Sequence, residues 1–415
     1  MEYLAKILLF FFLFIKMLCG SFSGHAQTYQ CYLYGSITTV DGDIYKGPIR
    51  WNDEEVFLTD VFNSSKESNP YLKYINGNDD EEHRSYYRRG RWYDRYSDGA
   101  RGTVNSKYDR KFECRFGDIK SISVTGRESV SLELKSGKFI NLSGGSNDVG
   151  SRIWILDHEL GLIKLDWDRV DVVDFYLPEK EMSEKFGNPI YGKLTTTKGE
   201  FTGFIQWDHD ERLLKDKLDG KSRDGDVAIP FDKIKSINKI EGGCRVKLHS
   251  ERNLELSGKN DVNRDNRGII VTIPGVGRID FPWKHFLSLD LTPFPESVAK
   301  CYSEFPESER LYGKITSTKG ETFEGVIVYD LDEAMDSEIL NGLNDKLDFS
   351  IPFRNIKIIQ PKAYNYCLVE LKNGEKLYLG DQTDVSDSNA GILIFTGENH
   401  YEFFKWKQIE SIEFM

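Results

Sequence analysis

Two acidic patterns recur along the chain, and both present the side-chain oxygens that a hard cation such as Ca²⁺ requires. The first places acids directly after an aromatic residue, in Trp51-Asn-Asp-Glu-Glu55, Trp207-Asp-His-Asp-Glu211 and Tyr329-Asp-Leu-Asp-Glu333. The second alternates Asp with Asn or Ser, in Asn147-Asp-Val149, Asn260-Asp-Val-Asn-Arg-Asp-Asn266 and Thr383-Asp-Val-Ser-Asp-Ser-Asn389. The candidate calcium ligands are therefore Asp261, Asn263, Asp265, Asp384 and Asp387.

Turn chemistry explains the same acidic patterns without a metal. Asp and Asn side chains accept hydrogen bonds from the nearby backbone in turns, and acids at strand ends oppose edge-to-edge aggregation. The patterns lack the Gly-centred loop of about twelve residues, ending in Glu, that defines an EF-hand. The first copy is also shortened after Val149. Turn formation is the favoured interpretation, and calcium binding is the alternative.

Arginine and aromatic residues are concentrated in one insertion, residues 63–111, which has no counterpart of its size elsewhere in the chain. Residues 83–111 contain nine basic and three acidic side chains, a local charge of +6. Arginine binds anions through paired hydrogen bonds and stacks on flat rings, and Arg, Trp and Tyr are enriched at binding interfaces. The candidate binding residues are Arg88, Arg89, Arg91, Trp92, Tyr93 and Arg95.

Two other interpretations of the insertion stay open. Long loops in compact domains are either functional or disordered. Because the rest of the chain is acidic, the basic insertion could also fold back on it, with Tyr and Trp covering apolar surface. Partner binding, self-docking and disorder are therefore the three alternatives for this segment.

No residues match the constellations of known catalytic motifs. Nucleophile elbows, Gly-rich phosphate loops and His-Glu-x-x-His runs do not occur in the sequence. Asp208 and Asp210 form a carboxylate pair of the type that glycosidases use, but similar acids occupy all three copies of the pattern. We therefore expect a protein that is not an enzyme, with a carbohydrate-active enzyme as the weakest alternative.

The N-terminus has the features of an export signal. Lys6 precedes nine apolar residues, and Gly24 and Ala26 supply the small residues of a cleavage site. We expect cleavage after residue 26 and a periplasmic or secreted protein without a membrane span.

Export permits a disulfide between Cys31 and Cys301, but the sequence leaves this bond undecided. Cys114, Cys244 and Cys367 align with Ile or Val in other copies, so we expect buried thiols.

The elements that position these residues form three tandem repeats. The repeats open with Tyr34-Gly-Ser-Ile-Thr-Thr-Val-Asp-Gly42, Tyr191-Gly-Lys-Leu-Thr-Thr-Thr-Lys-Gly199 and Tyr312-Gly-Lys-Ile-Thr-Ser-Thr-Lys-Gly320. Each repeat has two halves that close with an aromatic residue, two polar residues and an apolar strand, as in Phe231-Asp-Lys-Ile and Trp283-Lys-His-Phe. We expect a signal peptide at 1–26, unit 1 at 27–178, a linker at 179–188, unit 2 at 189–291, a linker at 292–309 and unit 3 at 310–415.

Alternating apolar residues and Gly-containing turns predict an all-β fold. Each half reads as a hairpin, a loop, a strand, a tight turn and a strand. This order resembles the Sm-like and Src-homology-type small β-barrels, which implies two five-stranded, barrel-like halves per unit. The resemblance concerns the fold and implies no catalytic residues. A six-bladed β-propeller, with one blade per half, is the alternative.

Composition limits the function classes. The 415 residues are 39% hydrophobic, enough for folded cores, and the net charge of −12 argues against a nucleic-acid binder. We expect an exported β-repeat protein with a binding or scaffolding role in the cell envelope and no cofactor. Its partner would be an envelope protein or an anionic glycan held by the insertion. The alternative is a surface or adhesion module stabilised by Ca²⁺.

Overall fold

The protein is all-β, as the sequence predicts. The computed structural model describes residues 31–75, 110–144, 148–179, 185–298, 300–398 and 400–415. Antiparallel strands and short 3-10 turns make up the described residues, which contain no α-helix. No helix in this part of the chain is long and apolar enough to cross a membrane. The predicted signal peptide, residues 1–26, lies outside the described residues.

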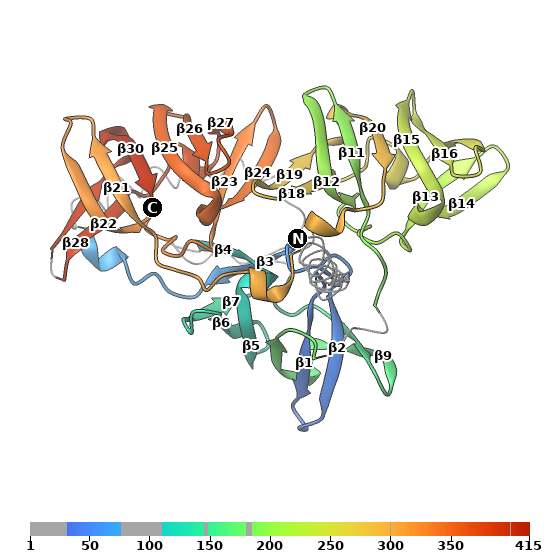
Figure 1. The fold of residues 1–415 in the computed structure, drawn as a ribbon, viewed down its shortest axis with the longest axis horizontal. Coiled ribbons are helices and arrows are strands. Elements are labelled where there is room, and N and C mark those ends of the chain that lie inside the picture. Colours follow the sequence, from blue (N-terminus) through green and yellow to red (C-terminus); the bar gives the residue numbers. More distant parts are fainter. Residues whose placement is uncertain (1–30, 76–109, 145–147, 180–184, 299, 399) are drawn as a thin grey trace, which may run out of the picture.

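Thirty strands form three consecutive sets of ten, which we call units 1, 2 and 3 (Figure 1). Unit 1 contains β1 (Tyr34–Thr39), β2 (Ile44–Trp51), β3 (Val61–Lys66), β4 (Arg110–Arg115), β5 (Ile119–Gly126), β6 (Ser129–Leu134), β7 (Phe139–Ser143), β8 (Ile153–Asp157), β9 (Gly161–Leu165) and β10 (Val170–Phe175). Unit 2 contains β11 (Tyr191–Thr196), β12 (Gly199–Trp207), β13 (Lys217–Ser222), β14 (Gly225–Pro230), β15 (Ile234–Ile240), β16 (Gly243–Leu248), β17 (Asn253–Ser257), β18 (Ile269–Ile273), β19 (Gly277–Phe281) and β20 (Phe286–Leu291). Unit 3 contains β21 (Tyr312–Ser317), β22 (Thr322–Val328), β23 (Ile339–Asn344), β24 (Leu347–Pro352), β25 (Ile356–Ala363), β26 (Tyr366–Leu371), β27 (Lys376–Gly380), β28 (Ile392–Gly397), β29 (His400–Phe404) and β30 (Ile409–Phe414).

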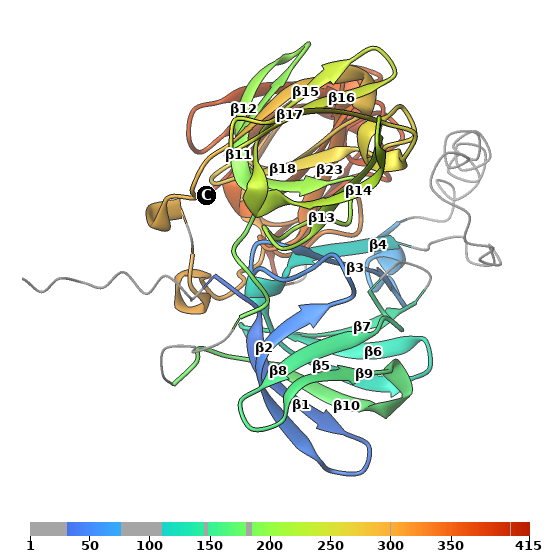
Figure 2. The same ribbon diagram turned by 90° about the vertical axis from the view of Figure 1, so that its right-hand side faces the viewer.

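The three units have the same strand order. In unit 1 the hydrogen-bonded order is β4-β3-β7-β6-β5-β10-β1-β2-β8-β9, and the pairings in units 2 and 3 repeat it. Each unit therefore contains two groups of five strands, joined by its fifth and tenth strands. The contiguous group contains the third to seventh strands. The split group contains the first, second, eighth, ninth and tenth, and Figure 2 shows both groups of unit 1.

These groups differ from the two sequence halves, which predict separate barrels from the first five and last five strands. β2 instead pairs with β8, through Ile49 and Ile155. The reason is the turn after Trp51, which takes the chain away from β2 and leaves that edge open to β8. Within the described residues no ladder closes either group into a barrel, and two continuous sheets replace the six blades of a propeller. The resemblance to Sm-like and Src-homology barrels stays a prediction.

Short 3-10 turns explain the repeated pattern of one aromatic and two polar residues. Each such turn begins at a buried Phe or Trp, and the backbone N–H of the first residue after the turn donates to that aromatic residue's carbonyl. The strand that follows then starts at once in the extended conformation. The turns are η3 (Phe116–Asp118), η4 (Trp167–Arg169), η5 (Phe231–Lys233), η7 (Trp283–His285), η10 (Phe353–Asn355) and η12 (Trp406–Gln408). The other 3-10 turns are η1 (Leu72–Tyr74), η6 (Asn260–Val262), η8 (Glu296–Val298), η9 (Tyr302–Glu304) and η11 (Thr383–Val385).

Units 2 and 3 share one hydrophobic core, whereas unit 1 has its own. The shared core follows from antiparallel pairing of β19 with β24, which joins the two units into one sheet of twenty strands.

Cys114, Cys244 and Cys367 are fully buried in these cores, which confirms the interpretation of these thiols as interior residues. Cys31 and Cys301 are both free thiols, so they form no disulfide.

Carboxylates that close the turns of one unit also bind cations of another. Asp60, Asp216 and Glu338 each accept two backbone N–H groups at the same place in their units, with distances of 2.7 to 2.8 Å. The Asp60 carboxylate also pairs with the fully buried Arg212 of unit 2, and Glu338 of unit 3 pairs with Lys66 of unit 1. Unit 1 is therefore attached to both other units by buried ion pairs.

Candidate functional site

The first acidic pattern forms a tight turn at the end of the second strand, which we call the corner (Trp51–Glu55, Trp207–Glu211 and Tyr329–Glu333). The backbones of its first and last residues are hydrogen-bonded, so the acids lie in a closed loop. In units 2 and 3 two consecutive corner residues have positive φ angles: Asp208 and His209, then Asp330 and Leu331. Asp tolerates this conformation better than most residues, which accounts for its place in the turn.

The second acidic pattern forms a polar loop (residues 148–152, 260–268 and 383–391) that covers each corner. The buried aromatic side chain of the corner donates a hydrogen bond to the main-chain carbonyl of an Asp in this loop. The three bonds are Trp51 Nε1 to Asp148 at 3.0 Å, Trp207 Nε1 to Asp261 at 2.9 Å and Tyr329 Oη to Asp384 at 2.6 Å. The aromatic and acidic patterns are therefore two parts of one motif.

The carboxylate of the same loop Asp holds the next strand. Oδ2 of Asp148, Asp261 and Asp384 accepts the backbone N–H of Asn63, Asp219 and Asn341 respectively, at 2.6 to 2.7 Å. Each of these Asp residues is at most 9% exposed. The repeated acids thus satisfy backbone donors inside the fold, which is the turn chemistry that the sequence favours.

Each corner also contains a glutamate with a buried oxygen that has no hydrogen-bond partner among the described residues. This oxygen is Oε2 of Glu55, Glu211 or Glu333. Burial, then the negative charge of the loop Asp, raises the pKa of all three carboxyls, to about 9 for Glu211. Two carboxylates that share an apolar site cannot both ionise at low cost, so each pair retains a proton near neutral pH.

Burial also raises the pKa of the loop carboxyls, although hydrogen bonds from the backbone lower it. The resulting pKa is about 7 for Asp148, about 6 for Asp261 and about 8 for Asp384. Burial is the largest cause in all three, and neighbouring acids raise the pKa further, such as Glu113 beside Asp148 and Asp384. A carboxyl with a pKa raised in the fold makes stability depend on pH.

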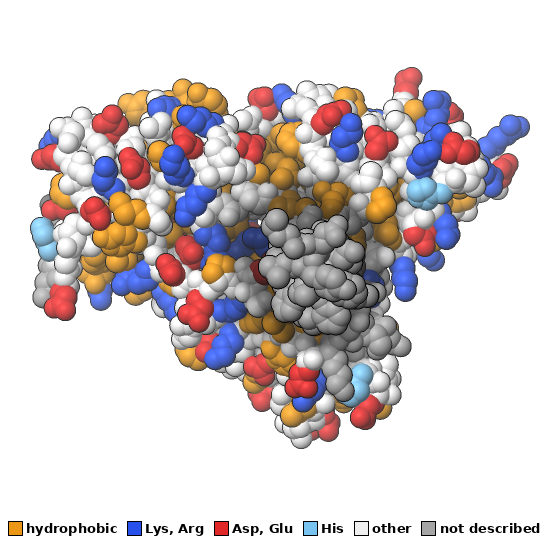
Figure 3. Space-filling model, in the orientation of Figure 1, with side chains coloured by type: hydrophobic (Ala, Val, Ile, Leu, Met, Phe, Trp, Pro, Cys, Tyr) orange, Lys and Arg blue, Asp and Glu red, His pale blue; other side chains and the backbone are white. Residues whose placement is uncertain are grey.

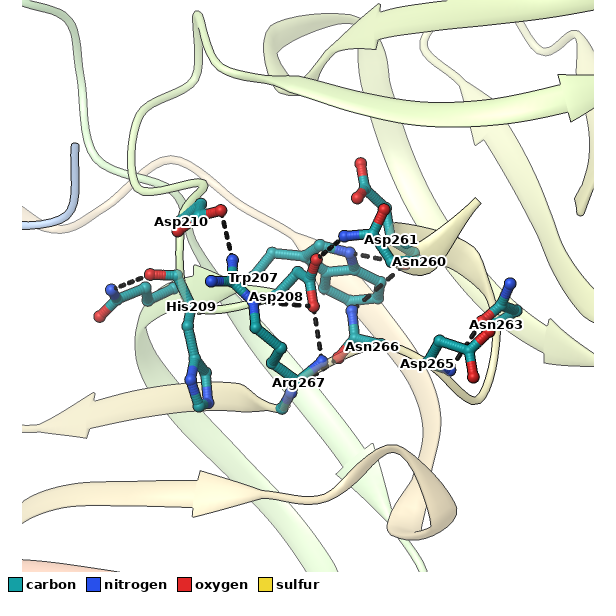
Figure 4. A network of polar contacts seen from close by, with 12 residues as sticks. Trp207, Asp208, His209, Asp210, Asn260, Asp261, Asn263, Asp265, Asn266 and Arg267 are labelled. Atoms are coloured by element: carbon teal, nitrogen blue, oxygen red, sulfur yellow. Dashed lines mark hydrogen bonds and ion pairs between the residues drawn. The ribbon is translucent and has the colours of Figure 1, made fainter. Parts of the chain in front are cut away.

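The three candidate calcium ligands of unit 2, Asp261, Asn263 and Asp265, do not converge on one point (Figure 4). Asn263 Oδ1 accepts the N–H of Asp265 at 2.7 Å, and both side chains lie away from the corner acids Asp208 and Asp210. The backbone N–H of Asp387 donates to Tyr364. Among the residues that the structure describes, no three His, Cys, Asp or Glu side chains form a group that could hold a metal ion.

The corner of unit 2 carries two polar contacts with residues from other strands and loops of the unit. Nε2 of His209 lies 2.9 Å from Oδ2 of Asp280, and Arg267 pairs with Asp210. Burial alone would lower the pKa of His209, but the hydrogen bond and charge of Asp280 raise it above its ordinary value. This pair was not predicted from the sequence, because its members are far apart in the chain. The signal was the His at a position where unit 3 has Leu331.

The beginning of the insertion is described, and it docks on unit 3. The ammonium of Lys66 bonds Asp332 at 3.2 Å, and the Asn69 amide donates to the Leu331 carbonyl at 2.8 Å. Tyr74 packs edge-on against Phe395 of β28. Hydrophobic side chains gather there beside β22 and β28 in Figure 3. The predicted binding residues Arg88, Arg89, Arg91, Trp92, Tyr93 and Arg95 lie outside the described residues.

Comparisons with known proteins add no family to this description. No protein-family model, curated protein or solved structure matches the chain.

Proposed function

We propose that the chain is an exported, non-catalytic scaffold of β-repeats that binds an anionic glycan of the cell envelope through the insertion in unit 1. The acidic residues of the three units support a structural role for the repeats. Their carboxylates accept backbone hydrogen bonds at the same positions in every unit, so they serve folding rather than one active site. Function is then expected where one unit departs from the others.

The observation that carries this proposal is the anchored base of the insertion. In units 2 and 3 the third and fourth strands are joined by turns of two residues, 223–224 and 345–346, but in unit 1 the same strands enclose residues 67–109. Lys66 is held by two buried carboxylates, and Tyr74 packs on unit 3. The described residues that precede the basic segment, 66–75, are therefore anchored on unit 3.

The chemistry of the insertion determines the ligand class. A local charge of +6 on a chain of net charge −12 favours an anionic partner. Arg pairs with carboxylate or sulfate oxygens in a two-pronged geometry, and Trp or Tyr stacks on the flat faces of rings. A polysaccharide with carboxylate groups offers both, and export places the protein where such polymers occur. An envelope protein is the alternative partner.

The test is binding to alginate, a polyuronate, with neutral dextran as the control polymer. A variant in which residues 76–109 are replaced by a short Gly-Ser linker keeps the docked base, Lys66 to Ile75, and should lose alginate binding. A second variant replaces Arg88, Arg89, Arg91 and Arg95 by Gln and should weaken binding by about tenfold or more because charged contacts dominate. Equal alginate binding by the wild type and both variants would refute the proposal.

A calcium-stabilised surface module is the second candidate, because each corner has a buried glutamate oxygen without a hydrogen-bond partner in the described part of the chain. A cation could replace the proton that each Glu–Asp pair retains. The test is the melting temperature at pH 9, above the pKa of about 8 of Asp384, with millimolar Ca²⁺ and then with chelator. A calcium-dependent rise that Asp261→Asn and Asp384→Asn abolish supports this function, and an unchanged melting temperature excludes it.

A further inference from the structure

One junction inside the chain shows how its sheets join edge to edge. β19, the ninth strand of unit 2, pairs antiparallel with β24, the fourth strand of unit 3. The register places Arg278 opposite Ser350, Ile279 opposite Phe349 and Asp280 opposite Asp348. A ninth strand and a fourth strand of this repeat are thus complementary edges.

The other units provide four more edges of these two kinds. Two of them are engaged within the molecule: Cys114 of β4 forms a bridge with Glu338 of unit 3, and Tyr401 of β29 packs against Tyr74 of unit 1. The remaining two are β9 of unit 1 and β14 of unit 2. In the described part of the chain β9 pairs only with β8, and β14 only with β13. One edge of each kind therefore remains open.

The open edges match each other when they are superposed on the existing junction. The repeat alignment equates β9 with β19 and β14 with β24, which places Leu162 opposite Ala228 and Ile163 opposite Val227. Lys164 then lies opposite Asp226, an attractive pair where the internal junction has two aspartates. Opposite charges and apolar pairs at facing positions stabilise antiparallel strands.

β29, the other ninth strand, makes a poorer match. In the same register β29 would place Phe403 opposite Asp226 and Glu402 opposite Val227. Each of these pairs puts a charged residue opposite an apolar one, so neither is attractive. Of the two ninth strands that do not pair with β24, which are β9 and β29, only β9 is therefore complementary to β14.

Exposed leucines show that β9 has apolar surface to bury. Leu160 and Leu162 are 69% and 62% exposed, although an edge strand with exposed apolar residues invites pairing. Asp226 and Ala228 of β14 are exposed as well. Association would place Leu162 beside Ala228 and bury part of its apolar surface, at a gain of about 25 cal/mol for each Å².

We infer that β9 of one copy of this chain pairs with β14 of a second copy, and that the protein assembles head to tail through this edge. The partner is a second copy because, within one molecule, buried ion pairs such as Arg212–Asp60 and Lys66–Glu338 hold unit 1 at a different place. Figure 1 accordingly shows β9 and β14 at separate positions. Because the two edges differ, each copy still offers one open edge, so assembly continues into a chain or closes into a ring.

The test is sedimentation equilibrium of the purified protein at increasing concentration, up to about 200 μM, a range that includes weak edge-to-edge contacts. We expect association that grows with concentration. Lys164→Glu or Asp226→Lys alone should weaken association by about threefold to tenfold, because each places two charges of the same sign opposite each other. The double variant should restore it, since the pair is attractive again with its signs exchanged.

Glu402→Lys on β29 is the matched control, because it makes a similar charge change on the equivalent strand that the inference leaves unpaired. Its association should equal that of the wild type. All four altered proteins should keep the wild-type melting temperature, since Lys164 and Asp226 are exposed. A monomer at all concentrations, or a double variant no better than the single ones, would overturn the inference.

Discussion

The corners of units 2 and 3 have the same backbone and different surroundings. Both end the second strand with a buried aromatic residue that bonds the polar loop. The unit 2 corner carries half-buried polar groups, with Asp210 paired to Arg267 and His209 to Asp280. The unit 3 corner is covered by the base of the insertion, where Tyr71, Tyr74 and Ile75 pack with Leu331.

This difference distinguishes the contacts that the motif makes in every unit from the contacts that depend on its surroundings. The hydrogen bonds from aromatic residue to loop and from loop Asp to strand occur in every unit, so they belong to the fold. The third residue of the corner varies among Asp53, His209 and Leu331, and its type follows the surface that it contacts. The four predictions below test this separation.

The largest effect is expected where unit 1 meets unit 3. Lys66→Met leaves Asp332 and Glu338, each 4% exposed, without their cation. Removing one partner of a buried ion pair costs about 3 to 5 kcal/mol. We expect the melting temperature to fall by several degrees in calorimetry. Lys46→Met, at an exposed lysine, is the control, and an equal fall in both variants would contradict a special role for the junction.

Removal of the donor from the corner should destabilise each unit by a smaller amount. Trp207→Phe deletes the bond to the Asp261 carbonyl and leaves a void, which together cost about 2 to 3 kcal/mol. Tyr329→Phe deletes only a hydroxyl, and its cost is about 1 kcal/mol. Denaturant unfolding of both variants measures the difference. If neither variant lost stability, the shared motif would not hold the corners together.

The pH dependence should differ between the loops. Asp384 has a pKa of about 8 in the fold and about 3.9 when unfolded, so its protonated form stabilises the fold fully below pH 4. That contribution is lost as the pH rises to about 8. Asp384→Asn, neutral at every pH, should therefore gain a few degrees in melting temperature relative to the wild type at pH 8. Asp387→Asn, in the same loop, should show no such gain.

The smallest effect is expected at the polar corner of unit 2. His209→Leu introduces the residue of unit 3 and removes a partly exposed contact with Asp280, which is worth less than about 1 kcal/mol. Asp280 raises the pKa of His209, so the stability that the pair contributes is present at low pH and lost as the pH rises through that pKa. Wild type and variant should therefore differ at pH 5.5 and converge at pH 9 in thermal unfolding. A constant difference at all pH values would exclude the charged pair as the cause.

The candidate site was only partly predictable. The recurring acids of the polar loop were evident from the sequence, and turn chemistry was the favoured interpretation of Asp261 and Asp384. Their aromatic partners Trp207 and Tyr329 were visible too, but the bond that joins them spans more than 50 residues. Ion pairs between units, such as Lys66 with Glu338, could not be found, because no local pattern indicates which surfaces meet.

The all-β class and the threefold repeat can be predicted from the sequence alone, because alternation of apolar residues and glycine turns is local information. The strand pairing becomes evident only in the folded protein. The turn after Trp51 takes the chain away from β2, so that β8 pairs with its edge. The split group of five strands therefore contains strands from both sequence halves. Strand pairing depends on contacts between distant residues, and neither propensity nor periodicity contains that information.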